Sequence, residues 1–515
     1  MPFFKTKKLL FFVLALSLTG LALKLLFVWG NSTAFTYDQG RDFLDLREMA
    51  VLGKLRLIGA NTSLHGVFYG PFWYWAAFPF YLLTKGNPFS TLIPLLLLSF
   101  LMPLAFFLLT SDKRLGLILT AVYIFSYSFF THTIVALNTN PMIFITPLFL
   151  LFLAKFYTKG KEVFLWSAIF LISVSFHLEP IIGLFGLPIF SLSVFFFKKV
   201  KLVLTKKRAF LAFFAPFLPQ ILFEFRHDFL QTRTVIALFS GKGSSLTPAS
   251  GNLFYRFFDR LDVFKNVFLY QLAQNLFLAI ILLILIGFLL IQLFSLKKLK
   301  EEHDFLTFLV LISLVIVFVG FVLYPYALWP WYLGTVDGLM VTLIGLAFYF
   351  LFKWKSRFLF LSMGLLLIFL LLNVFRYLPR SIEQTISDDP ANLRTRLKVV
   401  NMIYDDSKGR GMNVFTFAPY VYDYPYQYLI WWRAKSKYQY LPEQYFYLPA
   451  QPKYVVAKKE ADEMIPSKKS ECDYLIIEPF ESQEKWFWDW RYRFPEAQKT
   501  WNVGKTRIEK LCEDK

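Results

Sequence analysis

The sequence is poor in cysteine and in acidic residues. Its 515 residues contain two cysteines, Cys472 and Cys512, which excludes a cysteine-rich zinc site or a dense disulfide framework. Asp and Glu together number 35, against 55 Lys and Arg. No Walker loop, dinucleotide-binding glycine motif, HExxH pattern or G-x-S-x-G elbow is present. The chain therefore lacks the motifs of P-loop nucleotidases, dinucleotide-binding enzymes, zinc proteases and α/β-hydrolases.

Hydrophobic residues are what the sequence has in abundance. They make up 57% of the chain, aromatic residues make up 20%, and the mean hydropathy is +0.50. Uncharged runs of about 16–25 residues recur, which is the length that a helix needs to cross a bilayer. The runs are residues 9–29, 91–110, 115–131, 142–157, 163–176, 181–197, 209–223, 266–296, 305–324, 332–352 and 357–378. They predict a polytopic α-helical membrane protein with about eleven spans.

The distribution of charge predicts the topology. Residues 379–515 contain 22 basic and 20 acidic residues, whereas residues 1–378 contain 33 basic and 15 acidic residues. The basic residues of residues 1–378 form clusters, and successive clusters are separated by two apolar runs. All the clusters can therefore lie on the cytoplasmic side, as the positive-inside rule requires. We therefore expect an integral protein of the plasma membrane with a cytoplasmic N-terminus and an extracytoplasmic C-terminal domain. This pattern does not indicate a nucleic-acid partner.

If one aromatic segment crossed the membrane, every later basic cluster would lie outside the cell, so we expect this segment to stay on the outer face. Residues 71–84 begin with "PFWYWAAFPFYLL", which is short for a span and rich in Trp and Tyr. We expect an interfacial or re-entrant helix within a first outer loop of residues 30–90. A tilted short span is the alternative.

The composition changes after residue 378. Residues 379–515 are expected to form a small extracytoplasmic α/β domain, with a helix from Asp388 and Asp389 and short strands near residues 413–419 and 472–479. An extracellular location permits a disulfide between the two cysteines of this domain, although their spacing alone does not establish one. Residues 1–378 form the membrane domain in this interpretation.

The stretch "TYDQGRDF", residues 36–43, is the first polar cluster after the first apolar run. Thr36 and Gln39 fit a capping box, which would place Asp38 in the first turn of a helix and Asp42 one turn later. An ionised carboxylate at this point could accept a proton from a substrate hydroxyl. The alternative is an ordinary helix start with an Arg41–Asp45 pair.

Other polar residues are predicted to lie at the same outer face. The candidate catalytic residues are Asp38 and Asp42, and the candidate substrate- or phosphate-binding residues are Arg41, His65, Tyr69, His177, Glu179, Glu224, Arg226 and His227. Charges at membrane edges are costly, which makes them functional candidates, and Arg and His donors suit phosphate oxygens. Helix-end capping and interfacial anchoring are the alternatives for these groups. The metal ligands, if any, are unknown.

The layout resembles the GT-C integral-membrane glycosyltransferases, particularly the group of protein mannosyltransferases and lipid A aminoarabinose transferases. The residues that carry the resemblance are Tyr37-Asp38-Gln39 in the first outer loop and Gly70-Pro71-Phe72-Trp73-Tyr74-Trp75 at its end. A soluble extracytoplasmic tail is also usual in that group. The resemblance extends over about residues 9–240 by motif and over the rest by architecture.

The resemblance implies an inverting glycosyltransferase with a polyprenyl-phosphate-linked sugar as donor. The acceptor would be a hydroxyl on a protein, lipid or glycan, and Asp38 would be the general base. Here Gln39 replaces the second acid of the family's pair, and the family's lysine before the Pro segment is absent. Either Asp38 would act alone or Asp42 would assist, and Arg41, His65, Arg226 or His227 would bind the phosphate. No cofactor is certain, although some members use a divalent metal ion.

A transporter or lipid flippase for a glycolipid is the alternative function. It predicts ionisable residues near the middle of several spans. The apolar runs contain few such residues, with Lys24 in the first and Asp337 in the tenth. This scarcity favours the enzyme.

Overall fold

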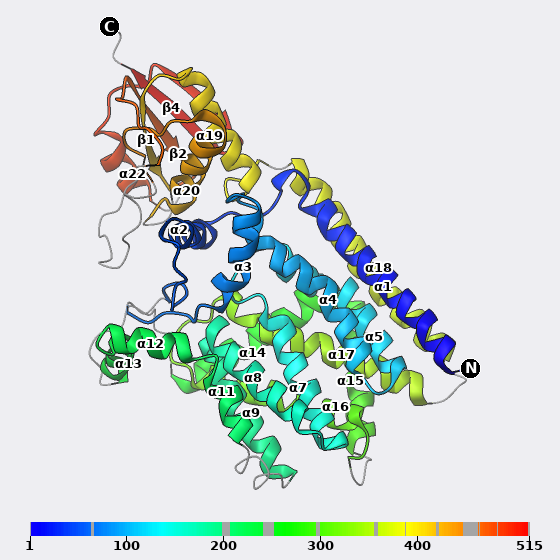
Figure 1. The fold of residues 1–515 in the computed structure, drawn as a ribbon. Coiled ribbons are helices and arrows are strands. Elements are labelled where there is room, and N and C mark those ends of the chain that lie inside the picture. Colours follow the sequence, from blue (N-terminus) through cyan, green and yellow to red (C-terminus); the bar gives the residue numbers. More distant parts are fainter. Residues whose placement is uncertain are drawn as a thin grey trace.

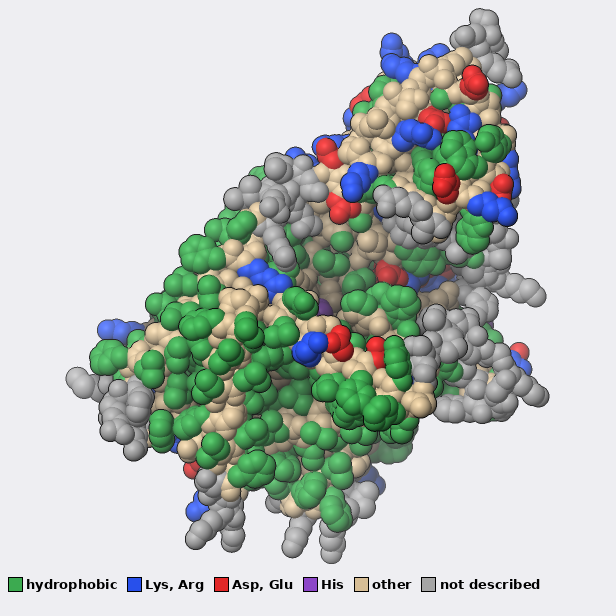
Figure 2. Space-filling model, turned by 180° about the vertical axis from the view of Figure 1, so that it is seen from behind, with side chains coloured by type: hydrophobic (Ala, Val, Ile, Leu, Met, Phe, Trp, Pro, Cys, Tyr) green, Lys and Arg blue, Asp and Glu red, His purple; other side chains and the backbone are tan. Residues whose placement is uncertain are grey.

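The computed structural model describes residues 2–62, 66–197, 207–239, 252–294, 299–354, 359–386, 388–418, 422–445, 462, 464–480 and 483–512. It consists of a large helical part and a small C-terminal α/β domain at one end of it (Figure 1). Hydrophobic side chains cover much of the surface of the helical part, whereas charged side chains gather on the C-terminal domain (Figure 2). This contrast matches a part embedded in lipid and a part exposed to water.

The helical part runs from α1 to α18. Its α-helices are α1 (Pro2–Phe27), α2 (Tyr37–Leu52), α3 (Phe72–Leu83), α4 (Ile93–Leu109), α5 (Lys113–Phe125), α6 (Tyr127–Thr133), α7 (Met142–Lys159), α8 (Glu162–Leu178), α9 (Pro180–Phe196), α11 (Lys207–Phe214), α12 (Leu218–Arg226), α13 (Leu230–Phe239), α14 (Leu253–Asn266), α15 (Leu276–Phe294), α16 (Glu302–Leu323), α17 (Gly334–Trp354) and α18 (Leu359–Ile386). Short helical turns of other types are η1 (Trp29–Asn31), η2 (Ser90–Leu92), η3 (Val267–Ala273) and η4 (Pro330–Leu333).

The predicted apolar runs all form helices. Among the described residues, seven helices are long and apolar enough to cross a membrane, and up to nine spans result if each of two bent pairs counts as one. The bent pairs are α5 with α6 and α11 with α12, while α8 and α9 are shorter apolar helices of 17 residues each. Each predicted run corresponds to one of these elements. The prediction of a polytopic helical protein is therefore confirmed.

Three predicted runs are interrupted in the structure, and one of them is 209–223, which bends by 59° between α11 and α12. The run 115–131 bends by 62° because Ser126 caps a new helix, its Oγ accepting from the Phe129 N–H at 3.2 Å. The run 266–296 was expected to be one span, but the apolar helix begins only at Leu276. Gln274, with φ +67°, ends η3, and Asn275 Oδ1 accepts from the Leu278 N–H at 2.8 Å.

The aromatic segment predicted to be interfacial forms α3, a helix of 12 residues. It lies between α2 and the long helices, at the end of the helical part that faces the C-terminal domain (Figure 1). Of the long apolar helices, α17 is the most buried, and α1 and α18 are the least. The latter two run side by side along one edge (Figure 1).

The C-terminal domain is built on a four-stranded sheet with the order β1-β2-β4-β3. The strands are β1 (Met412–Phe417), β2 (Cys472–Ile477), β3 (Lys499–Val503) and β4 (Thr506–Cys512), and the helices are α19 (Leu393–Ser407), α20 (Tyr424–Arg433) and α22 (Glu484–Arg491), with η6 (Ala434–Tyr438). β1 and β2 are parallel, and β4 pairs antiparallel with both β2 and β3. A disulfide joins Cys472 to Cys512, which face each other in the β2–β4 ladder.

The start of this domain differs from the expectation. α18 continues to Ile386, and the next helix begins at Leu393 rather than near Asp388. The side chain of Asn392 is the N-cap, since its Oδ1 accepts from the Arg394 N–H at 2.9 Å. Asp389 instead accepts from the Ala391 N–H in the preceding turn.

Candidate active site

α2 carries the predicted acidic cluster, and its first turn is capped as expected. Thr36 and Gln39 form a capping box in which the Thr36 N–H donates to Gln39 Oε1 at 2.8 Å. The other end of the Gln39 amide donates to the carbonyl of Ala136 at 2.9 Å. Gln39 thus caps α2 and ties it to the loop before α7. Asp38 lies in the first turn, where unpaired N–H groups favour a carboxylate.

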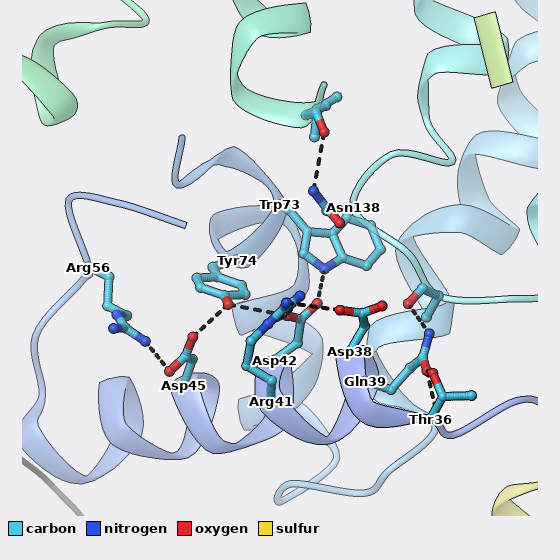
Figure 3. Close-up of polar contacts among 12 residues, drawn as sticks. Thr36, Asp38, Gln39, Arg41, Asp42, Asp45, Arg56, Trp73, Tyr74 and Asn138 are labelled. Carbon is cyan, nitrogen blue, oxygen red and sulfur yellow. Dashed lines mark hydrogen bonds and ion pairs between the residues drawn. The ribbon is translucent and has the colours of Figure 1, made fainter. Parts of the chain in front are cut away.

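One guanidinium bridges the two candidate catalytic carboxylates (Figure 3). Arg41 Nη1 lies 2.9 Å from Asp38 Oδ1, and Arg41 Nη2 lies 2.9 Å from Asp42 Oδ1. The Arg41–Asp45 pair of the alternative interpretation does not form, because Asp45 pairs with Arg56 from the following loop. The structure thus brings Asp38, Arg41 and Asp42 together as a unit.

Asp42 is the buried member of this unit. Its Oδ2 accepts from the Trp73 indole N–H at 2.9 Å, and its Oδ1 lies 3.2 Å from the Tyr74 hydroxyl. Burial raises the pKa of Asp42 to about 6, and the charge of Arg41 opposes that rise. Three side chains therefore hold Asp42 in place.

Asp38 is the solvent-exposed carboxylate of this unit. Its side chain is 41% exposed, whereas that of Asp42 is 3% exposed. Its ion-pair partner Arg41 is itself oriented by Asp42. Asp38 can therefore reach a substrate that Asp42 cannot.

Glu179 and Tyr69 lie together beside this unit. Glu179 separates α8 from α9 and is buried, and its Oε2 has no hydrogen-bond partner among the residues that the structure describes. Burial raises its pKa to about 8, so that the neutral acid predominates at pH 7. The pKa of Tyr69 is raised by burial and then by the charge of Glu179, while Arg41 acts in the opposite sense. The hydroxyl of Tyr69 thus lies within electrostatic range of both groups.

His177 packs under the turn that leads into α3. Its ring centroid lies 4.3 Å from that of Phe72 and 5.6 Å from that of Phe217. Gly70 lies so close to the imidazole that a Cβ at this position would collide with it. This arrangement gives the glycine of the Gly-Pro motif, and His177 with it, a packing role.

The remaining candidates lie away from Asp38. The Glu224 carboxylate accepts from the N–H groups of Gln231 and Thr232 at 3.0 and 2.9 Å, and the His227 ring donates from Nδ1 to the Phe223 carbonyl at 2.9 Å. These bonds stay within α12 and α13, which project to one side of α2 (Figure 1). Arg226 is exposed at the end of α12. His65 lies outside the described residues.

Comparison with known proteins identifies the fold. No protein-family model and no curated protein matches the sequence. Solved structures do match, and two of them cover nearly the whole chain. ArnT from Cupriavidus metallidurans bound to undecaprenyl phosphate has a TM-score of 0.62 at 10% identity, covering 97% of this chain and 97% of that chain. The apo state of ArnT has a TM-score of 0.59 at 11% identity, covering 95% and 96%. This chain has the GT-C fold.

The structure also joins the partly buried His132 to the buried Asp337, a pair that the sequence does not predict. His132 Nε2 lies 2.7 Å from Asp337 Oδ2, and His132 Nδ1 lies 3.1 Å from Asn140 Oδ1. The Asn140 amide donates to the carbonyl of Val135 at 2.7 Å. The His132–Asp337 pair therefore stabilises the loop between α6 and α7. The Ala136 carbonyl of the same loop accepts from Gln39, which caps α2.

A metal centre finds no support in the part of the chain that the structure describes. No group of three His, Cys, Asp or Glu side chains there is arranged to hold an ion.

Proposed function

We propose that this protein is a membrane glycosyltransferase that moves a sugar from a polyprenyl-phosphate-linked donor to the hydroxyl group of an acceptor. One observation carries the proposal: a partly exposed carboxylate, bridged by an arginine to a buried one, lies on α2 of a chain with the fold of ArnT. That relative was solved with undecaprenyl phosphate bound. A polyprenyl phosphate would be the lipid product of the proposed reaction.

Asp38 is the general base in this proposal. A base has to reach the proton that it removes, and the 41% exposure of Asp38 allows this. Asp42 is engaged by Trp73, Tyr74 and Arg41, which leaves it no access to an acceptor. Its role is to hold Arg41, and through Arg41 to hold Asp38.

The reaction is a single displacement. The acceptor oxygen attacks the anomeric carbon while Asp38 takes its proton, and the bond from that carbon to the phosphate oxygen breaks. The polyprenyl phosphate leaves with the bonding electrons, so the configuration at the anomeric carbon inverts. Arg41 supplies positive charge beside the base, which stabilises the developing phosphate charge. Glu179 donates a hydrogen bond to a sugar oxygen as a neutral acid, with Tyr69 beside it.

The membrane placement follows from the charge distribution. With the basic clusters in the cytoplasm, α2 and the C-terminal domain lie at the outer face of the plasma membrane. The lipid tail of the donor then stays in the bilayer while its sugar reaches Asp38. The acceptor is a protein, lipid or glycan on that side.

Transfer of a radiolabelled sugar from a panel of polyprenyl-phosphate-linked donors tests the proposal. We expect Asp38→Asn to lower transfer by about 100- to 10,000-fold, the usual contribution of a general base. Asp388→Asn is the matched control, because it removes an exposed carboxylate paired with Lys398 at 2.6 Å. Equal activity of wild type and Asp38→Asn would reject Asp38 as the base. Translocation of the donor lipid without transfer by wild type would favour a flippase instead.

A further inference from the structure

The C-terminal domain holds the segment that leads into α2. The Phe35 N–H donates to the carbonyl of Ala391 at 2.8 Å, and the Leu393 N–H donates to the carbonyl of Thr33 at 2.9 Å. These two bonds flank Ala34, which forms an isolated β-bridge with Asn392. The chain just before the N-cap of α2 is thus paired with the start of α19.

Arg396 reinforces this pairing from inside the C-terminal domain. Its Nη1 donates to the Phe35 carbonyl at 2.6 Å, its Nε to the Pro390 carbonyl at 2.7 Å and its Nη2 to Glu478 Oε1 at 2.8 Å. Arg396 and Glu478 are both fully buried, and Glu478 directly follows β2. A planar guanidinium can make these three bonds at once, whereas a lysine ammonium is a single point charge.

A second contact fixes the face of α2 that lies opposite Asp42. Gly40 lies against the backbone of Tyr424 and Pro425 so closely that any Cβ there would overlap it. The ring of Tyr37 lies 5.0 Å from that of Tyr424. α20 therefore packs directly on the first turns of α2, against Tyr37 before Asp38 and Gly40 after it.

We propose that Arg396 is a positioning residue that sets the orientation of Asp38 through Phe35 and the N-cap of α2. The C-terminal domain is then part of the active site and not an appended module. The inference rests on the proposed function, since it concerns the same base. Arg396 touches no reacting atom, and its effect reaches Asp38 through the backbone of residues 35–38.

Three full-length variants test this role. Arg396→Lys keeps the charge opposite Glu478 but cannot make all three bonds, and Arg396→Gln removes the charge. Because Arg396→Gln removes the buried cation that faces Glu478, this variant can unfold the domain, and Arg396→Lys is the decisive variant. Arg491→Gln is the matched control, since it breaks another ion pair of the same domain, Arg491 to Glu509 at 2.7 Å, that does not contact α2.

The readouts are amide hydrogen exchange and steady-state kinetics. In Arg396→Lys we expect exchange at residues 36–42 to be at least about 10-fold faster than in wild type, with β2 and β4 unchanged. We expect kcat to fall by about 10- to 100-fold with an unchanged KM for the donor. Arg491→Gln should leave residues 36–42 and kcat unchanged.

Two results would overturn the inference. Wild-type exchange at residues 36–42 in Arg396→Lys would show that Arg396 does not order α2. Faster exchange there with an unchanged kcat would show that the order does not matter for catalysis. If wild type transfers sugar from none of the donors, the proposed function fails, and with it the catalytic part of the inference. The exchange data then still decide whether Arg396 orders α2.

Discussion

The indole N–H of Trp73 donates to Asp42 Oδ2 across 2.9 Å and so joins α3 to α2. Trp73 belongs to the aromatic segment Gly70–Trp75, and Asp42 belongs to the acidic cluster after the first span. Through this bond the aromatic motif contacts α2, the helix that also carries Tyr37, Asp38 and Gln39 (Figure 3). The aromatic segment supplies hydrogen-bond donors to the acidic helix in addition to packing beside it.

Trp73→Phe removes this donor while keeping an aromatic ring. We expect kcat to fall by about 10-fold, because Asp42 loses a neutral donor and holds Arg41 less firmly. The free energy of unfolding should fall by about 1–3 kcal/mol, the usual cost of leaving a buried acceptor unpaired. Transfer kinetics and thermal unfolding in detergent measure the two effects.

Trp75→Phe is the control for this substitution. Its indole N–H donates to the Arg56 carbonyl at 3.0 Å, which lies outside the Asp38–Arg41–Asp42 unit. A similar loss of kcat in both variants would contradict a specific role for the Trp73 bond.

The acid side of the pH profile should depend on Asp42. Burial raises its pKa from 3.8 to about 6, so the carboxylate that orients Arg41 is lost as the pH falls through 6. The folded state binds a proton that the unfolded chain has already released, so the free energy of unfolding falls as the pH rises from about 4 to about 6. Activity and stability therefore change in opposite directions in this window.

Profiles of kcat/KM between pH 5 and pH 8 check this expectation. Wild type should lose activity below about pH 6, and Asp42→Asn should show a lower plateau without that loss. An unchanged acid limb in Asp42→Asn would assign the ionisation to another group.

Local features of the site were predictable from the sequence. The capping box of Thr36 and Gln39 involves residues three positions apart, and apolar run length marked the helices that the structure contains. Such signals depend on helix geometry and hydropathy, and both can be evaluated from a short stretch of consecutive residues. The placement of Asp38 in the first turn of α2 followed from them.

The partners of the cluster were not predictable. Arg41 and Asp45 have the spacing of a helical pair, yet Arg56 and Tyr74 take Asp45 because tertiary contacts bring them closer. His132 and Asp337 are 205 positions apart, and Arg396 and Phe35 are 361 positions apart. No period or motif in one sequence joins residues at such distances, since their meeting depends on how the helices pack.

The ionisation of Glu179 should determine how activity falls at alkaline pH. Burial raises its pKa from 4.5 to about 8, and the proposed hydrogen bond to the sugar needs the neutral acid. Activity should therefore fall as the pH rises through 8. The free energy of unfolding should also fall between about pH 4.5 and pH 8, because the folded state retains the proton.

Glu179→Gln and Glu179→Ala separate this role from packing. Glutamine resembles the neutral acid and cannot ionise, so we expect near wild-type transfer at pH 7 without the decline above pH 8. Alanine removes the donor and should lower transfer by about 10-fold or more. Equal loss in both variants, with the alkaline limb retained, would contradict the neutral-acid role.

Gly40→Ala tests how closely α2 must fit the C-terminal domain. The added methyl group would overlap the backbone of Tyr424 and Pro425, which cannot rotate away as a side chain could. We expect a loss of about 1–3 kcal/mol in stability, the usual cost of overpacking, and a larger fall in kcat than in donor affinity.

Gly287→Ala is the matched control, because that helical glycine has nothing within 4 Å of an added Cβ. It should unfold at the wild-type temperature or slightly above it, since alanine favours helix by about 1 kcal/mol over glycine. Wild-type kcat in Gly40→Ala would show that α2 tolerates displacement from α20, and that Asp38 does not depend on this contact.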